Sequence, residues 1–295
     1  VPSWNNNHYT HCVEGGHCDV EASAENNFMP TAADIAPHIK DAVILALCSP
    51  QNPTGTTFTK EALEAICDMV LEENKRRGAG EKKLYVLYDQ MYWQLTYGDI
   101  RHYDPVSLRP QMKAYTVYID AISKCFAATG VRVGWAMGPE AIMSKMKAIL
   151  SHVGAWAPMA EQKAVARFLL QYDDINNYLQ HFKAEISLRL QKIYNGFMRL
   201  KAEGLPVDAI APQAAIYLTV RVTARGMKTT SEQLLEQQKD VTGYLLNEAG
   251  IALVPFYAFG ASKDSSWYRL SVGACKKEEI DAMIEALAQA LRKLK

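Results

Sequence analysis

The sequence lacks the features that mark several classes of protein. No apolar run approaches the roughly 20 residues of a membrane-spanning helix, and no signal peptide is visible, so no membrane partner is expected. The 32 Lys and Arg residues balance 32 Asp and Glu residues, so no basic excess is available to bind nucleic acid. No repeat, low-complexity segment or helix-turn-helix pattern is present.

The sequence also lacks closely spaced pairs of cysteines. The six cysteines are scattered along 295 residues, and no Cys-x-x-Cys pair occurs. This usage is typical of reduced thiols and predicts a cytoplasmic protein. The spacing of the N-terminal cluster matches no standard zinc framework, so no metal site is expected at His8, His11, Cys12, His17 and Cys18.

The first half of the chain has the pattern of an α/β fold. Its 49% hydrophobic content and length suffice for one large core or two modest ones. A helical pattern with Thr59 as its N-cap covers 59–77. Apolar runs predict strands, the first of them buried on both faces, over 42–47, 84–88, 115–119 and 133–137. This order predicts a mostly parallel sheet with crossover helices.

The second half has a different pattern. One long or broken helix is expected over 159–200, which lacks proline and has no glycine before Gly196. A smaller α+β domain is predicted beyond this helix. Its strands are expected over 215–220 and 268–272, and its helices over 231–248 and 277–294. The predicted division is a large domain, an interdomain helix and a small C-terminal domain, over 1–165, 166–205 and 206–295.

Four short elements carry chemistry. Three follow predicted strands, where ligands bind to open parallel sheets. They are Ser-Pro-Gln-Asn-Pro-Thr-Gly at 49–55, Asp-Gln-Met-Tyr at 89–92, and Ser123-Lys124 with Arg132 eight residues beyond the lysine. The fourth is Arg269, inside the apolar run 267–272. Each alone has an ordinary structural explanation: a rigid turn, a helix N-cap, a solvated charge or a buried ion pair.

Taken in order, these elements form a more specific pattern. The pattern resembles the class I/II, fold type I aminotransferases that depend on pyridoxal 5′-phosphate. It consists of Asn-Pro-Thr-Gly, then Asp-x-x-Tyr, then Ser-Lys with its arginine, then an arginine in a late strand. The resemblance extends from Pro2 to the C-terminal helix. It implies amino-group transfer between an amino acid and a 2-oxo acid, on a large cofactor-binding domain and a small C-terminal domain, in a homodimer.

The resemblance assigns roles around the cofactor ring. Lys124 would bond covalently to the cofactor aldehyde and move the substrate proton, as the catalytic residue. Asp89 would pair with the pyridine nitrogen and keep it protonated. Asn52 and Tyr92 would donate hydrogen bonds to the phenolate oxygen. For Trp4 two interpretations stay open, which are stacking on the pyridine ring and packing in a core.

The resemblance also assigns residues to the two acidic groups. Arg132 would bind the cofactor phosphate, with Ser123 among the cofactor-binding residues, and Arg269 would hold the substrate α-carboxylate. The family often has a serine where this chain has Ala121. In the family, a glycine-rich phosphate-binding turn precedes the segment that matches Trp4, and this sequence does not contain it. The chain opens with Val1 instead of Met. We therefore expect a partial large domain that lacks roughly the first hundred residues of the family pattern.

Two alternatives to an aminotransferase remain at this point. Fold type I also supports lyases and decarboxylases, and an aminotransferase-like domain can be an inert effector module or fragment. The intact catalytic positions and the missing helix-turn-helix favour the enzyme. Dicarboxylate-specific relatives use a second arginine near the interdomain helix, and residues 151–158 contain none. This favours an apolar or aromatic amino acid as substrate.

Overall fold

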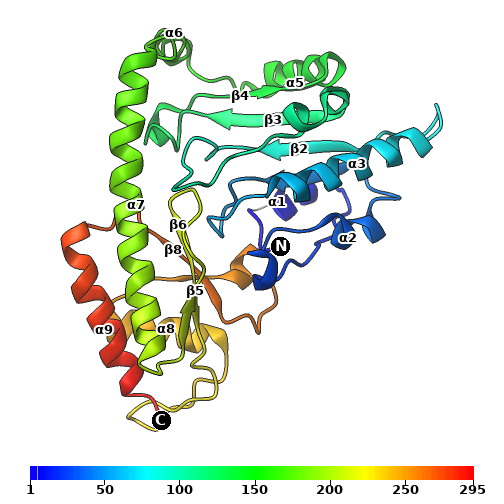
Figure 1. The fold of residues 1–295 in the computed structure, drawn as a ribbon. Helices are drawn as coiled ribbons and strands as arrows, with labels where there is room; N and C mark the ends of the chain where they lie inside the picture. The colour runs from blue at the N-terminus through cyan, green and yellow to red at the C-terminus, as the bar shows by residue number, and fades with distance from the viewer. Residues whose placement is uncertain (5) are drawn as a thin grey trace. The chain divides into compact units, whose positions relative to one another are not determined.

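A computed structural model of the chain describes residues 1–4 and 6–295 (Figure 1). The chain forms two units. One contains residues 29–50 and 57–182, and the other contains residues 1–28, 51–56 and 183–295. The short loop 51–56 therefore belongs with the C-terminal part of the chain, although it directly follows the first strand.

The first unit is built on a four-stranded sheet. Its strands are β1 (Ile44–Cys48), β2 (Tyr85–Asp89), β3 (Thr116–Ala121) and β4 (Gly134–Met137). They lie in the order β1-β2-β3-β4; the first three are parallel, and β4 runs antiparallel to β3. The predicted mostly parallel sheet is confirmed, with each strand within two residues of its predicted limits.

Helix α3 (Lys60–Arg76) connects β1 to β2, as the sequence predicts. Thr59 caps its start, because the hydroxyl accepts a hydrogen bond from the Ala62 N–H at 3.2 Å. Its core-facing side chains include the fully buried Leu63, Ile66 and Val70, whose spacing matches the helical period. The helix covers a face of the sheet in Figure 1.

One strand prediction is wrong in part. The run 42–47 is predicted to be buried on both faces, but Ile44 is 60% exposed and Val43 42% exposed. The reason is its place in the sheet: among the described strands β1 is an outer strand and pairs only with β2. The other end of β1 is covered, since Leu47 is buried.

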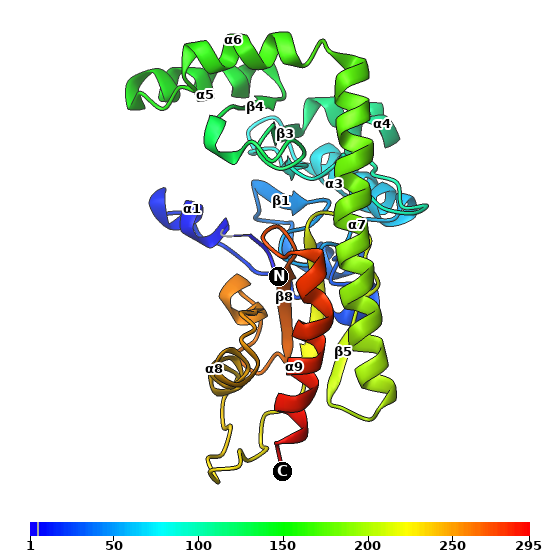
Figure 2. The ribbon, with the colours of Figure 1, turned by 90° about the vertical axis from the view of Figure 1, so that its left-hand side faces the viewer.

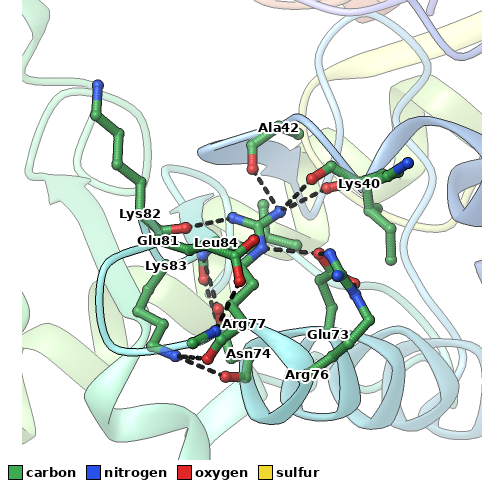
Figure 3. A network of polar contacts seen from close by, with 12 residues as sticks. Lys40, Ala42, Glu73, Asn74, Arg76, Arg77, Glu81, Lys82, Lys83 and Leu84 are labelled. Atoms are coloured by element: carbon green, nitrogen blue, oxygen red, sulfur yellow. Dashed lines mark hydrogen bonds and ion pairs between the residues drawn. The ribbon is translucent and has the colours of Figure 1, made fainter.

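A buried arginine ties together three segments of this unit (Figure 3). Arg77 follows α3, and its guanidinium donates to the Glu73 carboxylate at 2.7 Å. It also donates to the carbonyl of Lys82, before β2, at 2.7 Å. Before β1, it donates to three further carbonyls, those of Ile39, Lys40 and Ala42. The planar guanidinium can serve so many acceptors because its five N–H donors point in fixed directions.

The remaining helices of this unit lie before, between and after the strands in the sequence. They are the short α2 (Ala32–Ile35) and α4 (Pro105–Leu108), then α5 (Glu140–Val153), α6 (Met159–Phe168) and the first part of α7 (Tyr172–Ala202). The helix expected over 159–200 is therefore broken, at residues 169–171. Within the described chain, no helix has both the length and the apolar character needed to cross a membrane.

The second unit is an antiparallel sheet with helices, which confirms the predicted α+β class. Its strands are β5 (Val207–Ala209), β6 (Tyr217–Val222), β7 (Val254–Pro255) and β8 (Trp267–Ser271), in the order β5-β6-β8-β7. Its helices are α1 (Asn6–Cys12), α8 (Gln238–Ala249), α9 (Ile280–Arg292) and the end of α7. The sequence pattern does not predict β5 and β7, which have only three and two residues.

Helix α9 lies along the C-terminal half of α7 (Figures 1 and 2). The approach is close at Gly196, where a Cβ atom would lie 2.7 Å from a side-chain carbon of Ile284. An ion pair between Lys192 and Asp281, at 2.7 Å, joins the same two helices. Glycine at 196 therefore allows the helices to pack at this distance.

Candidate functional site

The carboxyl end of β2 holds a desolvated carboxylate. Asp89 is the last residue of β2 and lies opposite Ile119 on the parallel strand β3. Its Oδ1 accepts a hydrogen bond from the N–H of Met91 at 3.0 Å. Burial raises the pKa of Asp89, whereas the Met91 bond and the positive charge of Lys124 act against that rise. Lys124 therefore lies close enough to Asp89 to act on it electrostatically.

The loop after β3 carries three of the predicted site residues, which are Ser123, Lys124 and Arg132. Ser123 and Lys124 lie in the turn that follows β3, and both are half-buried. Two hydrogen bonds connect the loop: Thr129 Oγ1 donates to the Ser123 carbonyl at 3.0 Å, and Arg132 Nη1 donates to the Thr129 carbonyl at 2.8 Å. Arg132 is exposed and has a left-handed backbone with φ of 60°. Such backbones are uncommon outside glycine and concentrate at functional sites.

A second buried carboxylate, missed by the sequence analysis, fixes the turn after Asp89. Asp120 on β3 accepts hydrogen bonds from Trp93 Nε1 at 2.9 Å and from the Ala121 N–H at 2.7 Å. Burial raises the pKa of Asp120 to about 6. The Trp93 bond ties the turn of residues 90–93 to β3, and Tyr92, which is buried, lies on that turn. Asp120 therefore helps to position Tyr92 and Asp89.

In the other unit, Arg269 is paired with Asn52. Its Nη1 donates a hydrogen bond to Asn52 Oδ1 at 2.9 Å. Its Nε atom is buried and has no hydrogen-bond partner among the described residues. The neighbouring Tyr268 and Leu270 are buried on the opposite face of β8, as the period-two alternation of a strand predicts.

The loop 51–56 is held on the sheet of this unit through its own backbone carbonyls. The Thr54 carbonyl accepts a hydrogen bond from Thr219 Oγ1 at 2.8 Å, and the Gly55 carbonyl accepts one from the Ala214 N–H at 2.8 Å. Gly55 has φ of 71°, and a Cβ atom there would lie 2.3 Å from the carbonyl oxygen of Tyr217. Only glycine fits this approach, which places Asn52 against Arg269.

Trp4 belongs to the same unit as Arg269. The preceding Ser3 donates its N–H to the Phe259 carbonyl at 2.9 Å, and Gln51 Nε2 donates to the Pro2 carbonyl at 2.6 Å. The side chain of Trp4 is 38% exposed. The interpretation that Trp4 packs in a core is therefore wrong, and cofactor stacking stays a prediction.

The structure thus gathers the predicted site residues in two sets. Asp89, Tyr92, Ser123, Lys124 and Arg132 lie in the first unit, at and after the carboxyl ends of β2 and β3. Trp4, Asn52 and Arg269 lie in the second unit, around β8 and the loop 51–56. Over the described residues, no three His, Cys, Asp or Glu side chains group as metal ligands.

Two aromatic residues beside Arg269 were not found from the sequence. The guanidinium carbon lies 4.8 Å from the ring centroid of Tyr217 and 4.8 Å from that of Phe259. Tyr217 lies inside a predicted strand, but its contact with Arg269 depends on the pairing register of β6 and β8. Nothing in the local sequence indicates that register, so these contacts needed the structure.

Comparisons with known proteins agree with the resemblance. The family model of aminotransferase class I and II matches residues 1–287. Aspartate aminotransferases of Bacillus sp. (strain YM-2) and Geobacillus stearothermophilus are 30% and 31% identical to the chain, and each match covers 82% of it and 57% of the relative. The chain thus spans less than two thirds of the length of these curated relatives.

Solved structures show the same fold. An aromatic aminotransferase from Pyrococcus horikoshii OT3 is 26% identical with a TM-score of 0.84, and the match covers 99% of this chain and 72% of that one. An aspartate aminotransferase from Rhizobium meliloti has a TM-score of 0.87 over 100% of this chain and 70% of that one. At 24% identity, the second likeness shows the fold alone. The fold type I expected from the sequence is confirmed.

Proposed function

Because the chain belongs to the class I and II aminotransferases, we propose that the protein moves an amino group between an amino acid and a 2-oxo acid, with pyridoxal 5′-phosphate as its cofactor. One observation carries the proposal. The desolvated Asp89 carboxylate lies within electrostatic reach of Lys124, where the neighbouring parallel strands β2 and β3 end. Such strand ends are where open α/β sheets bind their ligands.

The chemistry of these residues fits the cofactor. A cation beside Asp89, such as a protonated pyridine nitrogen, would offset the burial that raises its pKa. The exposed guanidinium of Arg132 suits a phosphate dianion, and Ser123 lies on the same loop. Since Asn52 Oδ1 accepts from Arg269, its Nδ2 hydrogens are its donors for a phenolate oxygen. The buried Nε–H of Arg269 suits a carboxylate.

Each residue then has a defined task. The bound cofactor supplies an electron sink next to the substrate α-carbon. Lys124 provides the amine that holds the cofactor and moves the proton at the α-carbon. Asp89 would keep the ring nitrogen protonated, Asn52 and Tyr92 would donate hydrogen bonds to the phenolate oxygen, and Trp4 would stack on the ring. Arg269 binds the α-carboxylate that amino acids and 2-oxo acids share, so it orients both substrates in the same way.

Isotope transfer tests the proposed reaction. The purified protein is incubated with pyridoxal 5′-phosphate, a panel of ¹⁵N-labelled amino acids and an unlabelled 2-oxo acid. We expect ¹⁵N in the amino acid formed from the acceptor, with Lys124→Ala inactive and Lys145→Ala, an exposed lysine on α5, as active as the wild type. Release of CO₂ without ¹⁵N transfer would identify a decarboxylase, and no reaction at all would favour the inert module.

Covalent labelling tests the role of Lys124 separately. Borohydride reduction of the cofactor-loaded protein, followed by peptide mapping, should place the cofactor on Lys124. A label on another lysine would reject this assignment even if ¹⁵N transfer is observed.

The assembly and location are also part of the proposal. The family resemblance supports a homodimer, and the cysteine usage supports the cytoplasm. Light scattering of the cofactor-loaded protein should give twice the mass of one chain. A monomer that transfers ¹⁵N would reject the dimer and leave the reaction standing.

A further inference from the structure

Two aromatic rings lie beside the Arg269 guanidinium. The ring centroids of Tyr217 and Phe259 each lie 4.8 Å from its central carbon. Both rings are buried. A cation over an aromatic face is attracted by the negative ring centre, and the attraction is larger where water is excluded.

The sheet explains how the two rings reach one guanidinium. Strand β8 lies between β6 and β7, and Arg269 pairs with Thr219 on one side and with Val254 on the other. Tyr217 is two residues before Thr219 on β6, so both share the sheet face of Arg269. Phe259 ends the 3₁₀ turn that follows β7. The rings therefore approach Arg269 from the strands on either side of it.

We propose that Tyr217 and Phe259 are positioning residues that cover the two faces of Arg269 and make it a slot for a planar carboxylate. The proposal rests on the proposed function and deepens it. With both faces covered, an acid can reach the guanidinium only in its plane. Nη1 is held by Asn52, and the buried Nε–H has no hydrogen-bond partner among the described residues, so it is a donor left for an acid. A carboxylate is flat and can lie in the guanidinium plane, whereas a tetrahedral phosphonate has oxygen atoms out of that plane, toward the rings.

Direct binding to the cofactor-free protein tests the slot. Isothermal titration compares pyruvate, a 2-oxo carboxylate, with acetylphosphonate, which replaces its carboxylate by a tetrahedral acid. We expect the wild type to bind pyruvate more tightly than acetylphosphonate. Phe259→Leu should weaken pyruvate binding about 5- to 30-fold, since a leucine keeps the apolar contact and loses the ring. Phe259→Tyr and Tyr217→Phe keep a ring and should retain the affinity.

A core control separates positioning from general destabilisation. Phe256 lies on the same 3₁₀ turn, is fully buried, and packs edge-to-face on Phe28 at 5.1 Å. Phe256→Leu should lower the urea midpoint without changing the affinity for pyruvate. In the cofactor-loaded protein, Phe259→Leu should raise KM for amino donor and 2-oxo acceptor together, with a smaller change in kcat.

Several results would overturn the slot. They are equal binding of pyruvate and acetylphosphonate, no binding of pyruvate by the wild type, a Phe259→Leu variant with wild-type affinity, or a Phe259→Tyr variant as weak as the leucine variant. Failure of the proposed function looks different. In that case the wild type transfers no ¹⁵N, while the pyruvate titrations still decide whether the slot exists.

Discussion

Arg269 donates a hydrogen bond to Asn52 at 2.9 Å across 217 positions of the sequence. The bond joins the Asn-Pro-Thr-Gly loop to the late strand β8 within one unit of the chain. It fixes Nη1 of the guanidinium and sets the orientation of the Asn52 amide. The two residues are therefore expected to act on ligand binding as a pair, and substitutions of Asn52 should be felt at Arg269.

The charge at position 52 is expected to control carboxylate binding by Arg269. Asn52→Asp would place an anion 2.9 Å from the guanidinium, where it competes with an incoming carboxylate. We expect Asn52→Asp to weaken pyruvate binding to the cofactor-free protein by roughly tenfold or more. Asn52→Ala removes the hydrogen bond and leaves the cation available, so its effect should be smaller. Equal affinities of the two variants would contradict this prediction.

Gly55 is expected to tolerate no side chain. In Gly55→Ala, the new Cβ would meet the Tyr217 carbonyl at 2.3 Å in a backbone with φ of 71°. The backbone conformation alone destabilises alanine by about 1 kcal/mol. Because the contact is with backbone, which cannot rotate away, we expect a total loss of about 2–4 kcal/mol in the free energy of unfolding. Urea denaturation measures it.

A matched glycine isolates the contact from the backbone strain. Gly250 caps α8 in the same unit with φ of 65°, and nothing lies within 4 Å of its hypothetical Cβ. Gly250→Ala should show the conformational penalty alone. If both alanine variants lose the same stability, the approach of the loop 51–56 to β6 is looser than the structure shows.

The sequence predicts the identity of these residues better than their contacts. Asn52, Asp89, Lys124 and Arg269 stand out because motif order and strand ends are local properties of the chain. The bond between Arg269 and Asn52 depends instead on the packing of the loop 51–56 onto a sheet formed more than 150 residues later. Such long-range placement follows from strand register and from the room at Gly55, which no local pattern specifies.

Burial of β1 shows the same division between local and long-range information. The apolar run 42–47 predicts a strand, and the strand is present. Its exposure depends on which elements lie beside it, and the side chain of Ile44 is largely uncovered because β1 pairs with β2 alone among the described strands. Asp120 was missed for a similar reason, since its bond to Trp93 joins the turn after β2 to strand β3.

Arg77 is expected to contribute strongly to stability. Arg77→Met removes five donated hydrogen bonds and leaves four backbone carbonyls and part of the Glu73 carboxylate without their donor (Figure 3). Breaking a buried charged network by removing one partner destabilises a protein by about 3–5 kcal/mol. We expect a loss in that range, measured by urea denaturation.

The neighbouring arginine provides the control. Arg76 pairs with the same Glu73 but its side chain is 51% exposed. Since exposed ion pairs contribute little to stability, Arg76→Met should lower the urea midpoint far less than Arg77→Met. Similar losses in the two variants would show that the Glu73 charge, and not the carbonyl contacts of Arg77, dominates the network.

The Asp120 carboxyl is expected to make stability depend on pH between about 4 and 6. Burial raises its pKa to about 6 in the folded protein, against about 3.9 in an unfolded chain. Within this window the folded state binds more protons than the unfolded state, so stability from this group is present below pH 4 and is lost as the pH rises through 6. The shift corresponds to about 3 kcal/mol, at about 1.4 kcal/mol per pKa unit.

Asp120→Asn isolates this contribution. The amide cannot ionise, and it loses one of the two oxygen acceptors that serve Trp93 and Ala121, which gives an offset that does not change with pH. The free energy of unfolding of the variant, measured in urea relative to the wild type, should therefore rise by up to about 3 kcal/mol between pH 4 and pH 7. Titrating groups remote from residue 120 cancel in the difference, whereas Asp89, whose charge helps to raise the pKa of Asp120, titrates differently in the variant. A constant difference over this range would show that Asp120 is solvated enough in the folded protein to keep an ordinary pKa.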